Sequence, residues 1–159
     1  MSNVYKFKLG KAFQYAGPAP VRDFGPDPLV FSACGRDWLI ISPDGQITIS
    51  KDYCWDGCTP KFRLFDLFLP GTPDGIINVN TGQPKTYYAS LVHDVLYQFM
   101  DDPRMPFSRL QADQIFRNLL IKADFRPAPV YYGFVRLFGR LVPRLKKGYQ
   151  VMLRGFSYA

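Results

Sequence analysis

The chain has 159 residues, a length typical of one domain, and 47% of the residues are hydrophobic and 16% aromatic. This composition argues against a disordered chain, and no apolar run reaches the roughly 18 residues that suggest a membrane span. The net charge of +7 favours an anionic partner: a nucleic acid, a lipid surface or an acidic protein.

The N-terminal stretch and the cysteines indicate where the protein is made. Residues 1–17 alternate charged and apolar types and contain no continuous apolar core, so they do not have the form of a secretory signal. We therefore expect synthesis in a cytoplasm. The chain has an odd number of cysteines (Cys34, Cys54 and Cys58), which argues against a disulfide framework.

Residues 1–85 read as strands and loops. Residues 4–9 alternate as a strand does, whereas residues 16–28 are rich in proline and read as irregular loop. The clearest local signal is a hairpin, in which residues 38–42 and 46–50 flank the turn Pro43-Asp44-Gly45. Residues 64–69 form a short apolar run that fits strand or helix. Residues 70–84 read as a long surface loop of the kind that is often functional.

Residues 86–159 read as helical. Thr86 can cap a helix over residues 87–100, which Asp101-Asp102-Pro103 ends. The S-x-x-Q pattern of residues 108–111 has the form of a capping box and begins a helix that reaches about residue 123. A third helix is predicted over about 130–141, where Pro143 ends or kinks it.

These elements predict an α+β fold in a single domain that spans residues 1–159. Its β and loop half covers residues 1–85 and consists of a hairpin, short strands and long loops, and its helical half, 86–159, is a three-helix bundle. Basic residues alternate with apolar ones near the C-terminus: Arg136, Arg140, Arg144, Lys146, Lys147 and Arg154. They form either the solvated face of a helix or a contact with an anionic surface.

His93, the single histidine, lies in the stretch "YASLVHDVLY" and is followed by Asp94. Helical spacing puts His93 on one face with Tyr97, and Asp113 at the inward edge of the next, antiparallel helix. A buried carboxylate needs a partner, and His93 is the candidate. Asp113 would then fix the imidazole tautomer, so that the other ring nitrogen can take a proton from water. The alternative is a structural pair without catalysis.

Asp94 can hold a hard cation together with backbone carbonyls from a nearby glycine loop, and the cation would stabilise the oxyanion that forms at an ester carbonyl. Tyr97 can brace either carboxylate. Two other chemistries involve the cysteines. Cys54 and Cys58, with C-x3-C spacing, can bind zinc together with His93, or one of them can act as a nucleophile beside it. Cysteines packed at a turn are the plain alternative, and Asp56-Gly57 can likewise be a simple turn.

"HDVLY" followed by "ADQIF" resembles the catalytic helix pair of secretory phospholipases that cleave at the sn-2 position. The resemblance implies that His93 is the general base, Asp113 its orienting carboxylate and Tyr97 a support. It also implies calcium held by Asp94 and by a glycine loop upstream. The closest candidate for that loop is "YCWDGCTP", which contains Asp56 and Gly57.

A second resemblance covers more of the chain. "WDGCTP", "YYASLVHDVLY", "QADQIF" and "YYGFVRLFG" occur in the same order as in a family of uncharacterised proteins encoded by bacteriophages and prophages. This resemblance implies a phage origin, and hence synthesis in the cytoplasm of the host and incorporation in the virion. The partners would be other virion proteins or the host envelope, including an anionic lipid surface.

Three functions follow from these readings. The first is a virion-associated hydrolase with a His-Asp site that acts on a lipid ester of the host envelope when the phage infects or leaves the cell. The second is a non-catalytic structural component of the particle, in its tail, neck or capsid, in which His93 and Asp113 form a structural pair. The third is a basic accessory protein that binds nucleic acid.

Overall fold

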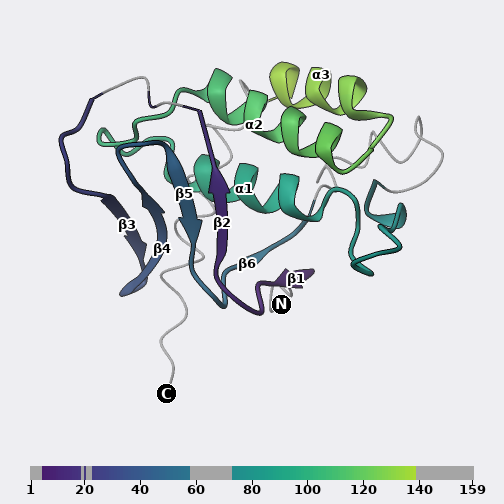
Figure 1. The fold of residues 1–159 in the computed structure, drawn as a ribbon, viewed down its shortest axis with the longest axis horizontal. Helices are drawn as coiled ribbons and strands as arrows, with labels where there is room; N and C mark the ends of the chain where they lie inside the picture. Colours follow the sequence, from purple (N-terminus) through teal and green to yellow (C-terminus); the bar gives the residue numbers. More distant parts are fainter. Residues whose placement is uncertain (1–4, 19, 21–22, 58–72, 139–159) are drawn as a thin grey trace.

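The computed structural model describes residues 5–18, 20, 23–57 and 73–138. It has the predicted α+β fold, because the described part of the chain begins with antiparallel strands and continues with three helices (Figure 1). None of the helices in these residues is both long and apolar enough to cross a bilayer.

The strands form a four-stranded and a two-stranded antiparallel sheet. The larger sheet has the order β2-β5-β4-β3, with β2 at Phe13–Ala16, β5 at Gln46–Ile49, β4 at Arg36–Ile41 and β3 at Leu29–Ala33. The smaller sheet pairs β1 (Phe7–Lys8) with β6 (Cys54–Trp55). The strand predicted over residues 4–9 is thus shorter than expected, and the sequence pattern did not single out β2 or β3.

The predicted hairpin is confirmed as β4 and β5. Its turn is closed by the Gly45 amide, which donates to the carbonyl of Ser42 at 2.8 Å, and Gly45 has a φ of +86° that favours glycine. The two strands alternate between a buried face and a more exposed one. The fully buried side chains of the hairpin are Leu39, Ile41, Ile47 and Ile49. This period of two directs one face of the sheet toward the core.

The three helices are α1 (Tyr87–Gln98), α2 (Arg109–Lys122) and α3 (Ala128–Phe138). The capping box of α2 is confirmed, since the Ser108 hydroxyl accepts from the Gln111 amide and the Gln111 side chain accepts from the Ser108 amide. The cap predicted for α1 is wrong in its chemistry. Thr86 occupies the N-cap position, but its hydroxyl donates to Asp74 at 2.8 Å and caps no backbone amide.

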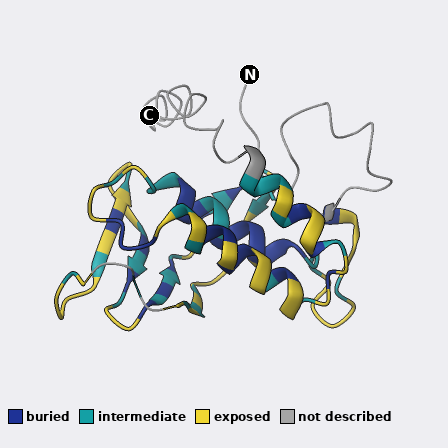
Figure 2. Cartoon of the chain, turned by 90° about the horizontal axis from the view of Figure 1, so that it is seen from above, coloured by how far each residue is buried: buried dark blue, intermediate teal, exposed yellow. Residues whose placement is uncertain are grey.

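The helices stack on the sheet, with α1 against the strands, α2 against α1 and α3 against α2 (Figure 1). One core lies between the sheet and α1, and a smaller one joins α1, α2 and α3. Figure 2 shows the buried residues along the inner faces of the helices and the exposed residues along their outer faces. This amphipathic pattern is the feature from which the sequence predicts the helices.

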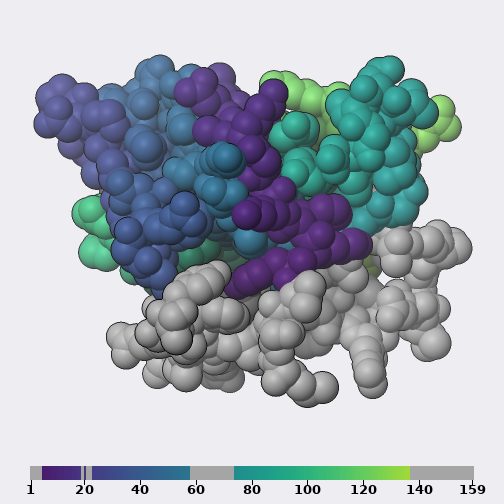
Figure 3. All heavy atoms as spheres, turned by 90° about the horizontal axis from the view of Figure 1, so that it is seen from below, coloured from purple at the N-terminus to yellow at the C-terminus, as the bar shows by residue number. Residues whose placement is uncertain are grey.

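The N-terminal segment ties the strands to α1. Seen from below, β1 and β2 (purple) lie between the strands β3–β5 (blue) and the segment that leads into α1 (teal) (Figure 3). Aromatic contacts hold this arrangement, because the Phe7 ring packs edge-on against Tyr87 with centroids 5.4 Å apart, and Phe13 stacks on Tyr88 at 4.5 Å.

Some predictions fall outside the described residues. These are the apolar run 64–69, the first part of the loop predicted over 70–84, the C-terminal end of the third helix, the role of Pro143 and any part played by Cys58. Within the described part, the third helix begins at Ala128, two residues before the predicted start.

Candidate functional site

The candidate site lies where α1 and α2 pack together. His93 and Tyr97 are one turn apart on α1, and their rings lie 4.2 Å from each other between centroids. The His93 ring also contacts Phe116 of α2 at 5.0 Å. Since Tyr97 contacts Asp113 while His93 contacts Phe116, the two helices run antiparallel, as predicted.

Asp113 is the centre of the site and is almost fully buried, with 1% of its surface exposed. The Nε2 atom of His93 lies 3.1 Å from Oδ1, and the Tyr97 hydroxyl donates to the same oxygen at 2.6 Å. A buried carboxylate is costly unless hydrogen bonds satisfy its oxygens. The structure therefore brings together His93, Asp113 and Tyr97, the three residues expected to do the chemistry.

Arg136 is a partner of Asp113 that nothing in the sequence pattern indicated. Its guanidinium comes from α3 and donates from Nη1 to Oδ2 of Asp113 at 3.1 Å. Its side chain keeps 36% of its surface exposed. All three helices thus meet at a single carboxylate. The sequence placed Arg136 only on a basic face, because helical spacing does not show where a third helix packs.

The electrostatics of the site keep Asp113 ionised and Tyr97 protonated. Burial raises the pKa of Asp113, but hydrogen bonds from His93, Tyr97 and Arg136 outweigh it, so the pKa lies below the ordinary value. Burial and the hydrogen bond to Asp113 raise the pKa of the Tyr97 hydroxyl far above its ordinary value. The same contact to Asp113 raises the pKa of Arg136. Tyr97 is therefore a donor over the whole neutral range.

The charge of Asp113 determines the tautomer of His93. An ionised carboxylate can only accept hydrogen bonds, so the proton of the neutral imidazole lies on Nε2 and the lone pair on Nδ1. In the described part of the chain, no residue donates to Nδ1. Every buried side-chain nitrogen and oxygen atom there has a hydrogen-bond partner, so Nδ1, which has none, is not buried. With 13% of the His93 side chain exposed, water can reach this nitrogen.

The expected calcium ligands come from two separate segments of the chain. Asp94 follows His93 on α1. Gly57 lies near the start of that helix, because a Cβ atom added to it would lie 2.9 Å from the carboxylate of Asp74. The Asp74 carboxylate in turn accepts a hydrogen bond from Thr86, the residue before α1. Asp94 is eight residues beyond Thr86, which is about 12 Å along a helix axis. Among residues 5–18, 20, 23–57 and 73–138, no group of three or more acidic, histidine or cysteine side chains could hold a metal ion. Calcium at Asp94, Asp56 and Gly57 therefore stays a prediction of the resemblance.

Asp74 is a second buried carboxylate, which the sequence placed in a surface loop. It is 7% exposed, accepts from the Thr86 hydroxyl at 2.8 Å and pairs with Lys6 at 2.7 Å. Gly57, with a φ of +76°, packs directly against it. This cluster fixes the start of α1, two turns from His93. Lys6 and Asp74 are 68 residues apart in the chain, so no local pattern could have revealed the cluster.

The cysteine chemistries find little support in the described residues. Burial raises the pKa of the Cys54 thiol, and its sulfur donates to the carbonyl of Asp52 at 3.4 Å. A raised pKa lowers the thiolate fraction that a nucleophile or a zinc ligand needs. Cys34 is exposed at a turn, with a φ of 52°.

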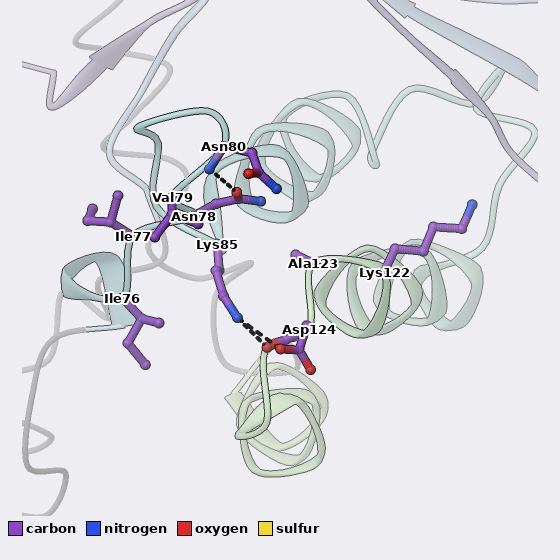
Figure 4. A pocket seen from close by; sticks show the side chains of 9 residues that line it. All are labelled: Ile76, Ile77, Asn78, Val79, Asn80, Lys85, Lys122, Ala123 and Asp124. Atoms are coloured by element: carbon purple, nitrogen blue, oxygen red, sulfur yellow. Dashed lines mark hydrogen bonds and ion pairs between the residues drawn. The ribbon is translucent and has the colours of Figure 1, made fainter.

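A surface hollow of about 530 Å³ lies apart from the His93 network, between the loop before α1 and the end of α2 (Figure 4). Lys85 points across it to Asp124, and its ammonium group donates to the Asp124 carbonyl at 2.8 Å and to the carboxylate at 3.2 Å. The lining residues are Ile76, Ile77, Asn78, Val79, Asn80, Lys85, Lys122, Ala123 and Asp124. The ion pair already neutralises Lys85, so the hollow has no strong feature that would select a ligand.

Most of the basic C-terminal segment lies beyond the described residues, and Arg136, its first member, is paired with Asp113. Comparison of the chain with models of protein families, with curated proteins and with solved structures finds no match. A function therefore has to be inferred from the geometry around Asp113.

Proposed function

We propose that the chain is a phage-encoded, virion-associated protein in which His93 is the general base of a hydrolase-type site that acts on a lipid ester of the host envelope. The observation that carries the proposal is the hydrogen bond of 3.1 Å between His93 Nε2 and the buried Asp113, which leaves Nδ1 as the basic nitrogen on the water side.

In the proposed reaction, His93 is the base and water is the nucleophile. Nδ1 of His93 takes a proton from water while the water oxygen forms a bond to the ester carbonyl carbon. Asp113 accepts a hydrogen bond from the Nε2–H group throughout and stabilises the imidazolium that results. When the carbon–oxygen bond of the ester breaks, the imidazolium returns the proton to the leaving alkoxide. Tyr97 and Arg136 hold Asp113 in place throughout.

Calcium would act as a Lewis acid on the ester carbonyl, with Asp94 and the loop of Asp56 and Gly57 as its ligands. No step of the reaction above is routed through the ion.

The phage origin and the virion location are supported by the four sequence blocks between residues 55 and 139, which keep the order of the phage family that they resemble. An enzyme that acts on the host envelope has to travel with the particle or be made in the infected cell. The net charge of +7 favours an anionic surface as the place of action.

The test is hydrolysis of vesicles made of phosphatidylethanolamine and phosphatidylglycerol, followed as release of fatty acid. We expect turnover by the wild type, loss of at least about 100-fold in His93→Gln, and full activity in Gln114→Ala, an exposed position on α2 next to Asp113. Circular dichroism and thermal unfolding show whether each variant is folded. Equal release by the wild type and folded His93→Gln would refute the role of His93 as a base.

A second candidate is a structural component of the particle, and the ion pair of Arg136 with Asp113 favours it. Arg136 neutralises the carboxylate, which weakens the support that Asp113 gives to an imidazolium. In this role, the network fastens three helices to one another. His93→Gln would then lower the stability of the protein or its assembly, and the wild type would release no fatty acid.

A further inference from the structure

We infer that Arg117 and Arg136, on either side of Tyr132, form a binding site for a phosphate group on the face where α2 and α3 pack together. This site is distinct from His93 in its residues and does not require His93 to act as a base. Its ligand is a phosphate-bearing molecule, either a free phosphate ester or the headgroup of a lipid.

Two pairs of side chains make contact between the antiparallel helices α2 and α3. Asp113 and Arg117 are one turn apart on α2, and Tyr132 and Arg136 are one turn apart on α3. Asp113 pairs with Arg136, and the guanidinium of Arg117 lies over the Tyr132 ring at 5.6 Å from its centroid. The two contacts are therefore one helical turn apart along α2 and along α3.

Both guanidinium groups keep donors for a ligand. Arg136 uses Nη1 for Asp113, and its side chain is 36% exposed. Arg117 is exposed, and its contact with Tyr132 is a cation–π contact, which does not use an N–H group as a hydrogen-bond donor to oxygen. Planar guanidinium groups bind phosphate oxygens in pairs of parallel hydrogen bonds, which lysine cannot do.

The local charges favour an anion. Asp113 compensates Arg136, and Asp101 lies 3.6 Å from Arg109, one turn before Asp113 on α2. Within the described residues, no carboxylate pairs with Arg117. The site therefore has the positive charge of Arg117 beside that of Arg136, which the buried Asp113 compensates.

The site adjoins His93 through Asp113. The Nε2 atom of His93 and Nη1 of Arg136 bond to the two oxygens of the same carboxylate. The imidazole and the guanidinium are thus separated by no more than that carboxylate and two hydrogen bonds. A phosphate bound by Arg136 would therefore lie next to a residue that shares its carboxylate with His93.

The test compares Arg117→Gln and Arg117→Lys with Arg126→Gln in the full-length protein. Arg126 is an exposed arginine in the connection between α2 and α3, so its change removes the same charge from a nearby surface. The probes are inorganic phosphate, titrated by calorimetry, and vesicles of phosphatidylglycerol or phosphatidylcholine, measured by co-sedimentation. None of these readouts depends on hydrolysis.

We expect Arg117→Gln to weaken binding by about tenfold, Arg117→Lys to weaken it less, and Arg126→Gln to leave it unchanged. Binding of inorganic phosphate with this pattern indicates a free phosphate ester, and the same pattern with phosphatidylglycerol vesicles alone indicates a lipid headgroup. Either result supports the site. Equal weakening by Arg117→Gln and Arg126→Gln would overturn it, because it would show a general attraction to positive charge. Absence of binding to both probes would overturn it as well.

Discussion

Replacing Asp113 by asparagine keeps the shape of the side chain and removes its charge. In the wild type, the two carboxylate oxygens accept from three donors, on His93, Tyr97 and Arg136. The asparagine amide of the variant has one oxygen and one NH₂ group, so at least one of these donors faces another donor. Asp113→Asn therefore tests whether the carboxylate holds the three helices together.

The magnitude follows from how far each partner is buried. Hydrogen bonds to a charged group contribute about 1.5–3 kcal/mol each, but the bond from Arg136 is discounted because that side chain is 36% exposed. The variant retains the bond from the Tyr97 hydroxyl, while the bond from His93 weakens. We expect the free energy of unfolding to fall by about 2–4 kcal/mol, and the Tm by roughly 5–12 °C for a chain of this size.

The loss depends on pH in a defined way. The pKa of Asp113 in the folded protein lies below its ordinary value of 3.8, so its charge stabilises the fold fully at pH values above 3.8. This stability is lost as the pH falls through the depressed pKa of the folded state. The difference between wild type and Asp113→Asn should therefore shrink as the pH falls below about 4.

Urea unfolding followed by circular dichroism at pH 3, 4, 5 and 7 measures this difference, and Asp101→Asn is a suitable control. Asp101 is 72% exposed on its side chain and lies 3.6 Å from Arg109, so its loss should cost little. An Asp113→Asn protein as stable as the wild type at pH 7, or a difference that grows between pH 4 and pH 3, would refute the view that a charged Asp113 stabilises this fold.

Three further outcomes are expected. Tyr97→Phe should cost about 1–2 kcal/mol of stability at neutral pH. In the alkaline titration at 295 nm, the variant should lack a tyrosine that ionises well above pH 10. Because the pKa of Tyr97 is raised in the folded protein, its stabilising effect is full below pH 10 and is lost as the pH rises through the raised pKa. Gly57→Ala should lower the free energy of unfolding by about 1–3 kcal/mol, because its φ is +76° and the new Cβ atom would lie 2.6 Å from the Phe7 ring. Gly25→Ala is the control: its φ is +90° but the space around it is open, so it measures the cost of the backbone conformation without the contact. Calcium titrated to millimolar concentration should give binding heat with the wild type and none with Asp94→Asn, as the resemblance to the phospholipases implies; equal heats would rule out calcium at Asp94.

The helices and the central hairpin could be predicted because their signals are local. The apolar residues of α1 and α2 keep helical spacing, the capping box marks the start of α2, and Pro43-Asp44-Gly45 marks the hairpin turn. Asp113 was found for the same reason. Its place three residues before Phe116 put it on the inner face of α2, and a buried acid requires a donor.

The remaining features depend on contacts between distant residues. Arg136 is 23 residues from Asp113, and Lys6 is 68 residues from Asp74. Thr86 has the residue type of a helix cap, yet its hydroxyl is taken by Asp74. Strands β2 and β3 are stabilised by pairing with β5 and β4, and with four and five residues each they are too short for a clear pattern in the sequence. Such features are set by tertiary packing, which the local sequence does not encode by itself.

The central claim is that the pair of His93 with Asp113 leaves a basic Nδ1 atom facing water. Because His93 is the single histidine, a long-range proton–nitrogen correlation spectrum of tag-free, ¹⁵N-labelled protein reports its tautomer without assignment. At alkaline pH, we expect a protonated Nε2 and an unprotonated Nδ1, and Asp113→Asn should shift the ring toward a mixture of tautomers. A wild-type ring with its proton on Nδ1 would contradict the account, because Nε2 would then have no proton to donate to Asp113.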